Sequence, residues 1–150
     1  MRQRPHRQDS EAELNTYRHK VQYYETDKMG ITHHSNYIRF MEEARVDFLS
    51  QIGWDYERLE EIGIVSPVTA VDCRFRSPTA FADVIETEVW IEEFKGARLK
   101  IGYLMKKSDG TVVCEAHSEH CFINADGHPI RLKKEHPEFA EVLERLANNK

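Results

Sequence analysis

The stretch of sequence that decides the fold is YETDKMGITHHSNYIRFMEEARVDFLSQI, residues 24–52. In its second half the apolar residues recur at helical spacing, at Tyr37, Met41, Ala44, Phe48 and Ile52. The apolar face is widened by Ile38, Phe40 and Leu49. A face this wide predicts a helix from about His34 to Gln51 that other parts of the chain largely enclose.

Outside this helix the chain carries the two-residue alternation of β-strands. A first strand is predicted over 17–24, and four longer series follow at 71–76, 85–92, 98–106 and 112–122. The turns between the longer series are short, and the sequence Asp-Gly in the last of them is a strong hairpin signal. Short hairpins exclude a doubly wound parallel sheet. We therefore predict an α+β fold, with a curved antiparallel sheet of about five strands around the central helix.

The remaining segments are predicted from their end signals. Asp55 is placed to cap a short helix that runs to about Ile62, and Pro137 suits the first turn of a C-terminal helix. Residues 1–15 are polar, and we expect them to be a flexible leader. No linker or repeat divides the rest, so residues 16–150 are predicted to form a single domain.

Composition narrows the class of partner. The chain has 150 residues and a net charge of -5, so it lacks the overall basic field typical of nucleic-acid binding and a polybasic membrane patch. No run of 18 apolar residues is present, which argues against a membrane-spanning helix. The cysteines are three, with no CxxC pair, and this predicts a reducing, cytoplasmic setting.

Three short motifs carry a family resemblance. They are Thr26-Asp27-x-x-Gly30, His34-x-x-Tyr37 and Glu42-x-Ala44-Arg45, and the later run HCFINADGHPIRLKK adds to them. Together they resemble the hotdog-fold acyl-CoA thioesterases of the 4-hydroxybenzoyl-CoA thioesterase and YbgC-like group, over about residues 17–146. The resemblance implies a hotdog fold, hydrolysis of acyl-CoA to a carboxylic acid and free CoA, and Asp27 as the catalytic carboxylate. It also implies that the backbone amide at His34 polarises the thioester carbonyl.

These residue types suit the reaction on physical grounds. A thiolate leaves readily, since a thiol has a pKa of about 8.5, so one carboxylate and one oxyanion site suffice. The carboxylate of Asp27 acts either as a general base on water or as a nucleophile on the carbonyl. If the helix begins near His34, its free amides and positive end form the oxyanion site. Gly30 lets the loop turn and bring Asp27 beside them.

Each candidate also has a plain structural reading. Asp27 is equally the type of residue that caps a turn, and the His34 imidazole is either a pocket wall or a partner of Asp27. Tyr37 is either core or a substrate contact. Glu25 stands where the family often has another aspartate, and its role is open. Because another hotdog clade uses a glutamate of the central helix, the helix residues Glu42 and Glu43 are the alternative catalytic carboxylates.

Coenzyme A carries phosphates, so basic side chains are expected near the pocket mouth. In the resembled enzymes a basic turn meets the nucleotide, and the matching turn here offers Lys95 and Arg98. A second basic run contains Arg131, Lys133 and Lys134. No metal or redox cofactor is implied. A metal site at His117 and His120 is not expected, because these residues fall on opposite faces of a predicted strand.

Three questions about assembly and activity stay open in the sequence. The resemblance implies a homodimer at least, and often a homotetramer. Alternative functions are a hotdog hydratase or dehydratase acting on acyl thioesters, and a non-catalytic acyl-CoA-binding protein. The acyl group is not specified, nor is its carrier, which is either CoA or an acyl-carrier protein.

Overall fold

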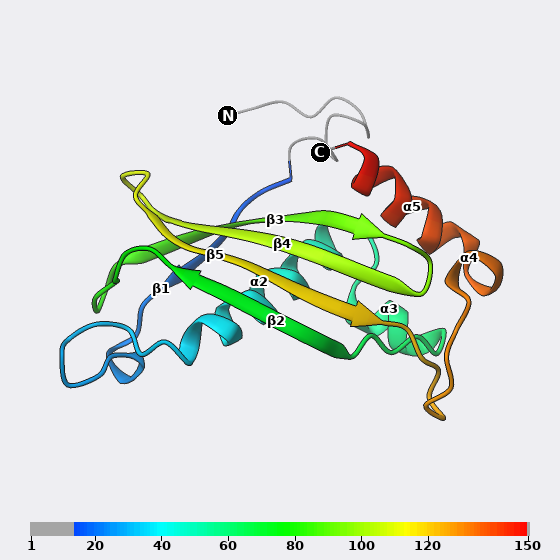
Figure 1. Ribbon diagram of the computed structural model, residues 1–150, viewed down its shortest axis with the longest axis horizontal. Coiled ribbons are helices and arrows are strands. Elements are labelled where there is room, and N and C mark those ends of the chain that lie inside the picture. Colours follow the sequence, from blue (N-terminus) through cyan, green and yellow to red (C-terminus); the bar gives the residue numbers. More distant parts are fainter. Residues whose placement is uncertain (1–13, 150) are drawn as a thin grey trace.

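The computed structural model describes residues 14–149. Five antiparallel strands form one sheet in the order β1-β3-β4-β5-β2. The strands are β1 (Tyr17–Lys20), β2 (Val68–Phe75), β3 (Val84–Phe94), β4 (Arg98–Lys107) and β5 (Val112–Cys121). The helices are α2 (Asn36–Gln51), α3 (Tyr56–Glu61), α4 (Leu132–Glu135) and α5 (Pro137–Asn148), and a 3-10 turn, η1, spans Tyr23–Glu25. The predicted α+β class, a curved sheet around a helix, is confirmed (Figure 1).

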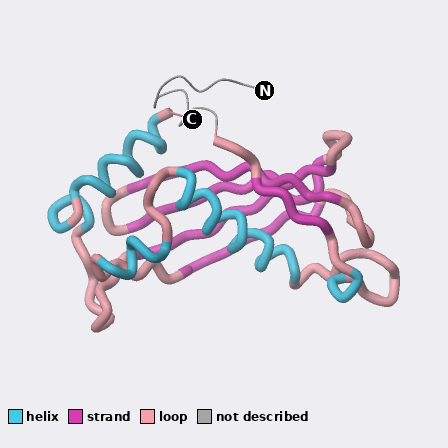
Figure 2. Tube along the Cα trace, turned by 180° about the vertical axis from the view of Figure 1, so that it is seen from behind, coloured by secondary structure: helices cyan, strands magenta, loops and turns pink. Residues whose placement is uncertain are grey.

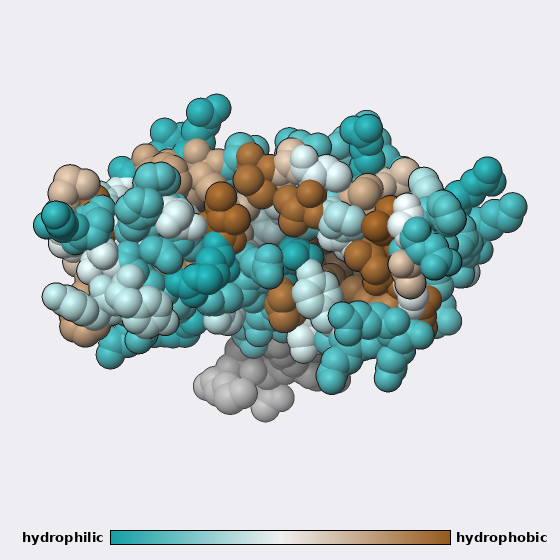
Figure 3. All heavy atoms as spheres, turned by 90° about the horizontal axis from the view of Figure 1, so that it is seen from below, coloured by the Kyte–Doolittle hydropathy of each residue, from teal (hydrophilic) through white to brown (hydrophobic). Residues whose placement is uncertain are grey.

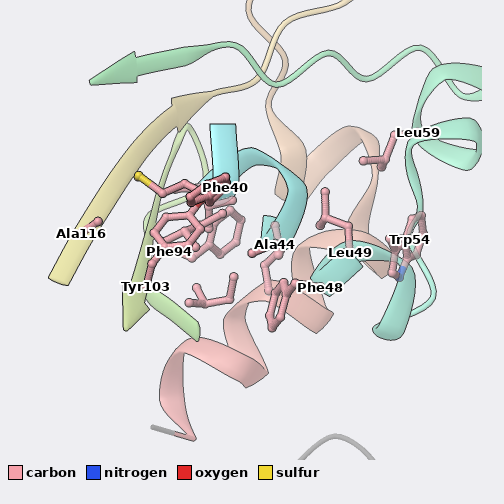
Figure 4. Close-up of a cluster of buried hydrophobic side chains, with 14 of the residues drawn as sticks. Phe40, Ala44, Phe48, Leu49, Trp54, Leu59, Phe94, Tyr103 and Ala116 are labelled. Atoms are coloured by element: carbon pink, nitrogen blue, oxygen red, sulfur yellow. The ribbon is translucent and has the colours of Figure 1, made fainter. Parts of the chain in front are cut away.

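Helix α2 lies across one face of the sheet, which curves around it (Figure 2). Its apolar side chains meet the inward residues of the strands to form the core, and the fully buried side chains include Phe40, Ala44 and Tyr103 (Figure 4). At the far end, Phe139 of α5 packs on Trp54 with ring centroids 4.9 Å apart. The wide apolar face of α2 is therefore explained by its contacts with β1, β3 and α3, while the segment just after the helix, at Trp54, packs on α5.

The first strand is shorter than the sequence predicts. The alternation suggests a strand over 17–24, but β1 ends at Lys20, which pairs with Val84, the first residue of β3. The residues before Val84 form a turn, and of residues 21–24 only Val21, which is fully buried, still exchanges backbone hydrogen bonds with it, at Asp83 and Ala82. The chain then forms η1. The short helix α4 is a further element that the sequence pattern did not predict.

Strand β2 is one of the two edge strands of the sheet, and it is exposed along its length. Val71, Cys73 and Phe75 alternate as inward residues should, but Val71 is 40% exposed and Phe75 is 51% exposed. Val68 on the same strand is 47% exposed, and Val65 just before it is 43% exposed. We call these four large residues, Val65, Val68, Val71 and Phe75, the β2 strip. Figure 3 looks onto this side of the molecule and shows hydrophobic residues gathered across it.

The predicted leader lies almost wholly outside the described residues, which include only its last two, Leu14 and Asn15. Asn15 exchanges two hydrogen bonds with the Gln51 side chain at the end of α2. No helix within residues 14–149 is long and apolar enough to cross a membrane.

Candidate active site

A cavity of about 310 Å³ opens beside the N-terminus of α2. Three sequence segments line it: the loop of residues 27–34, the first turn of α2, and the end of β2 with the following loop. The lining residues are Asp27, Met29, Ile31, Thr32, His34, Tyr37, Phe75, Arg76, Ser77 and Pro78. Most of the wall is apolar, as is usual in small-molecule sites. The structure thus brings Asp27, His34 and Tyr37 together around one cavity.

Asp27 sits in a tight turn and is half-buried. One carboxylate oxygen, Oδ1, accepts a hydrogen bond from the Met29 amide at 2.8 Å, and the Asp27 carbonyl accepts one from the Gly30 amide at 2.9 Å. Gly30 has φ +81°, a left-handed conformation that favours glycine and turns the chain back. Among residues 14–149, no group donates a hydrogen bond to Oδ2. The turn-capping reading and a chemical role are therefore compatible, because each uses a different oxygen.

The helix start differs from the prediction by two residues. Helix α2 begins at Asn36 rather than near His34, and residues 34–35 form a turn before it. The amides of Asn36 and Tyr37 are occupied, donating to the carbonyls of His33 and His34. The amide of His34 itself has no acceptor within the described part of the chain. His34, which is in the turn and lines the cavity, therefore carries a backbone donor that is free within residues 14–149.

The positive end of α2 is not neutralised by its own first turn. No acidic residue lies there, and the Ser35 hydroxyl bonds the His33 ring at 2.9 Å instead of capping the helix. The helix dipole is therefore available to a negative charge developing in the cavity. The His34 ring stacks on His33 with centroids 4.4 Å apart and lines the cavity.

Tyr37 contributes its ring to the cavity but turns its hydroxyl into the wall. A hydrogen bond of 2.8 Å joins its OH to Oγ1 of Thr79, which bonds Oγ1 of Thr32 at 2.6 Å. All three side chains are buried. Burial raises the pKa of Tyr37, and the bonds to Thr79 and Thr32 only partly offset this. The hydroxyl is therefore a neutral structural group that joins α2 to both loops of the cavity.

This wall gives a stability prediction. Replacing Thr79 by Val should destabilise the protein by about 1–3 kcal/mol, because the buried Tyr37 hydroxyl loses its partner. The measurement is urea unfolding followed by circular dichroism. In a Tyr37→Phe background the same change should cost much less, since both partners are then apolar. Equal costs in the two backgrounds would show that the hydroxyl pair contributes nothing.

Arg76 is a cavity residue that the sequence pattern missed. Its guanidinium donates to Glu115 at 3.3 Å, and both side chains are about half exposed. The alternation of β2 marks position 76 as outward-facing, but the strand ends at Phe75 and the alternation ends with it. The loop that follows is held against the Asp27 loop, where Ile31 pairs with Ala80. No local signal reports that contact between distant segments.

Lys95 and Arg98 lie elsewhere, at the hairpin between β3 and β4. Leu99 of this hairpin pairs with His120, whereas the cavity lies near the other end of β5, where Cys114 pairs with Phe75. The hairpin and the cavity of one chain are thus at opposite ends of the sheet (Figure 1). Lys95 forms an ion pair with Glu93 at 3.2 Å. The second basic run lies beside the hairpin, since the Lys133 ammonium is 5.9 Å from the centroid of the Phe94 ring.

The alternative carboxylates, Glu42 and Glu43, are on another surface of α2. They line a separate groove of about 490 Å³, together with Tyr17, Arg39, Val46, Asp47 and Ser50. Glu43 accepts hydrogen bonds from Tyr17 at 3.1 Å and from Arg39 at 2.8 Å, whereas Glu42 is 65% exposed. Neither glutamate lines the cavity that holds Asp27.

The histidines of β5 separate as strand spacing predicts. His120 is buried on the inner face, where its Nε2 bonds Ser118 at 2.8 Å, and burial lowers its pKa to about 4. His117 is on the outer face, 3.3 Å from Asp72. Within residues 14–149, no group of three or more His, Cys, Asp or Glu residues is arranged to hold a metal ion.

Comparisons with known proteins agree on one group. The model of the thioesterase-like superfamily matches residues 21–146. A putative esterase of Aquifex aeolicus is 35% identical over 119 residues, which cover 79% of this chain and 91% of that protein. A putative acyl-CoA thioesterase of Bacillus subtilis, YneP, is 29% identical over 127 residues, 84% of this chain and 92% of that protein. The structure of a DHNA-CoA thioesterase from Staphylococcus aureus superposes with a TM-score of 0.84, at 28% identity, covering 89% of this chain and 91% of that one.

Proposed function

Since this chain belongs to the thioesterase-like superfamily and has the hotdog fold, we propose that it hydrolyses acyl-CoA thioesters with Asp27 as the catalytic carboxylate. The observation that carries this proposal is the position of Asp27. Asp27 lines a mostly apolar cavity together with His34, and within residues 14–149 its Oδ2 and the His34 amide have no hydrogen-bond partner. The products are a carboxylic acid and free CoA.

The mechanism follows from these two groups. The acyl chain lies against the apolar wall, and the thioester oxygen accepts a hydrogen bond from the His34 amide near the positive end of α2. Asp27 then either removes a proton from a water molecule that attacks the carbonyl carbon, or attacks that carbon with Oδ2 to form a mixed anhydride, which water afterwards hydrolyses to the acid and free Asp27. In both cases the negative charge grows on the oxygen at His34, and the CoA thiolate leaves. The bond from Met29 to Oδ1 keeps the carboxylate oriented.

The decisive experiment is a turnover assay on acyl-CoAs from acetyl to palmitoyl and on benzoyl-type esters. Thiol release, followed with a disulfide reagent, is the expected result. An absorbance change at the enoyl group without thiol release would indicate a hydratase or dehydratase instead. Binding without either signal would indicate a non-catalytic acyl-CoA-binding protein. The same panel, offered on CoA and on acyl-carrier protein, identifies the acyl group and its carrier.

We further propose that the enzyme is a homodimer, or a homotetramer built from such dimers, in the cytoplasm. Two features support assembly: β2 is an unpaired edge strand, and the β2 strip leaves large apolar side chains exposed. The three cysteines, Cys73, Cys114 and Cys121, are free thiols, which suits a reducing compartment.

Antiparallel pairing of β2 with β2 of a second copy also accounts for the distant basic hairpin. In such a pair, the Val68 end of one strand lies beside the Phe75 end of the other. The hairpin with Lys95 and Arg98 is at the Val68 end of its own sheet, so it comes to the side of the partner's cavity. The basic side chains of one subunit would then contact the CoA phosphates bound at the other.

This arrangement predicts a binding defect. The double change Lys95→Ala and Arg98→Ala should raise KM for acyl-CoA several-fold more than it lowers kcat, because phosphate contacts are remote from the reacting bond. Steady-state kinetics with acyl-CoA measure both constants, and light scattering checks that the molecular mass is unchanged. A short acyl-pantetheine, which lacks the nucleotide, should be hydrolysed equally by both proteins. An unchanged KM for acyl-CoA would reject the contact.

A further inference from the structure

Glu25 is a buried carboxylate two residues before Asp27, and it does not line the cavity. It is 1% exposed, at the end of η1. Its Oε1 accepts hydrogen bonds from the Gln22 amide at 2.8 Å and from Nε2 of His19 at 2.9 Å. Its Oε2 forms an ion pair with Arg39 of α2. One side chain thus joins β1, the Asp27 loop and the central helix.

The backbone of Glu25 makes a second connection to the same helix. Its carbonyl oxygen accepts hydrogen bonds from the His33 amide at 2.8 Å and from Nδ2 of Asn36 at 3.0 Å. Asn36 is the first residue of α2, and its Oδ1 in turn accepts from Arg39 at 3.1 Å. Both the side chain and the backbone carbonyl of Glu25 therefore connect the segment before Asp27 to the start of α2, and the carbonyl also binds the residue before His34.

The hydrogen bonds and the ion pair around Glu25 keep its carboxylate ionised. Burial alone would raise the pKa of Glu25, but the bonds from Gln22, His19 and Arg39 lower it below its usual value. Because the pKa of Glu25 is lowered in the folded protein, its carboxylate stabilises the fold at any pH above the ordinary glutamate pKa of about 4.3. This stabilisation is lost as the pH falls through the lowered pKa of the folded protein. The carboxylate is thus charged throughout the neutral range. Arg39 is also held from its other side by Glu43 at 2.8 Å.

We infer that Glu25 is a positioning residue for the hydrolysis, which sets the Asp27 carboxylate and the His34 amide in register with each other. The expected effect on kcat rests on the proposed function, whereas the expected effect of Glu25 on the two backbone segments does not. Two reacting groups that come from a loop and from a turn need a common support, because an error of about 1 Å between them costs on the order of a hundredfold in rate. Glu25 is that support. It is joined to Asp27 through Thr26, and its carbonyl is hydrogen-bonded to the amide of His33, the residue before His34.

The kinetic test is the variant Glu25→Gln, which keeps the size of the side chain and removes its charge. We expect kcat to fall at least tenfold, while KM and the binding stoichiometry of a non-hydrolysable thioether analogue change less than threefold. The matched control is Asp47→Asn, a carboxylate further along α2 that accepts from Gln51 at 2.7 Å. It should leave kcat within twofold. If Glu25→Gln fails to fold, Arg39→Gln removes the same ion pair at a position that is 41% exposed, and the same split is expected.

A second readout does not depend on activity. Amide hydrogen exchange should become at least tenfold faster at Asp27 and His33 in Glu25→Gln, whereas amides of β4 and β5 keep their rates. A wild-type protein with no thiol release, but with this exchange pattern in the variant, would refute the proposed function and leave the support in place. Unchanged exchange would overturn the inference. So would wild-type turnover that Glu25→Gln retains within twofold, or loses only in proportion to the folded fraction.

Discussion

Replacing Asp27 by Asn should lower kcat by at least about a hundredfold while leaving the fold intact. The amide retains an oxygen that can accept the hydrogen bond from the Met29 amide, so the turn keeps its cap. What is lost is the negative charge of a carboxylate whose residue lines the cavity. Neither proton removal from water nor attack on the carbonyl carbon proceeds without that charge. Thiol release under saturating acyl-CoA measures the change.

The control for this variant is Asp83→Asn. Asp83 also caps a turn, since its Oδ2 accepts from the Ala80 amide at 2.8 Å, but it does not line the cavity. The two substitutions therefore make the same chemical change to two capping carboxylates. A purely structural Asp27 would give two variants with similar kcat and similarly small losses of stability. That result, or near-normal turnover by Asp27→Asn, would remove Asp27 from the mechanism.

The second large effect is expected at His34, where two substitutions test the backbone amide and the side chain separately. His34→Pro deletes the free amide and should lower kcat by about 10²–10³, the usual cost of one oxyanion donor. No internal hydrogen bond is lost with it, because within residues 14–149 this amide has no acceptor. His34→Ala keeps the amide and removes the imidazole, and we expect it to lose less than about tenfold. Kinetics of both variants are compared after circular dichroism and analogue binding confirm folding.

Each outcome at His34 assigns a role. Equal losses in the two variants would mean that the imidazole, rather than the amide, acts on the substrate. Full activity in His34→Pro would mean that the oxyanion site lies elsewhere. Because proline also restricts the residue before it, the analogue-binding measurement decides whether a loss of kcat reflects chemistry or a displaced loop.

The sequence predicts the fold well wherever periodicity is long. The helix that carries Tyr37 and Phe48 and the strands of the sheet follow directly from their apolar spacing, because one face of each must be buried. The error at residues 21–24 has a specific cause. The chain there still looks like a strand, but its ladder ends where β3 begins at Val84. Such an end is set by a neighbouring segment, and local pattern does not report it.

The candidate site was predictable only in part. Asp27 and His34 could be predicted because they lie in two neighbouring motifs that carry the family resemblance, and the structure brings both residues to one cavity. Arg76 and Thr79 were not found, since their places depend on a loop that meets the Asp27 loop across the fold. The role of Glu25 was open for the same reason, because its partners His19 and Arg39 belong to different elements.

The bare edge of the sheet has a consequence for how the enzyme behaves in dilute solution. If two copies pair through their β2 strands, the basic side chains that contact the CoA phosphates at each cavity come from the neighbouring subunit. Turnover per subunit then follows mass action: at low protein concentration the subunits separate, and affinity for CoA esters falls with them. Asp27 and His34 belong to the same chain, so dissociation should raise KM for acyl-CoA before it lowers kcat.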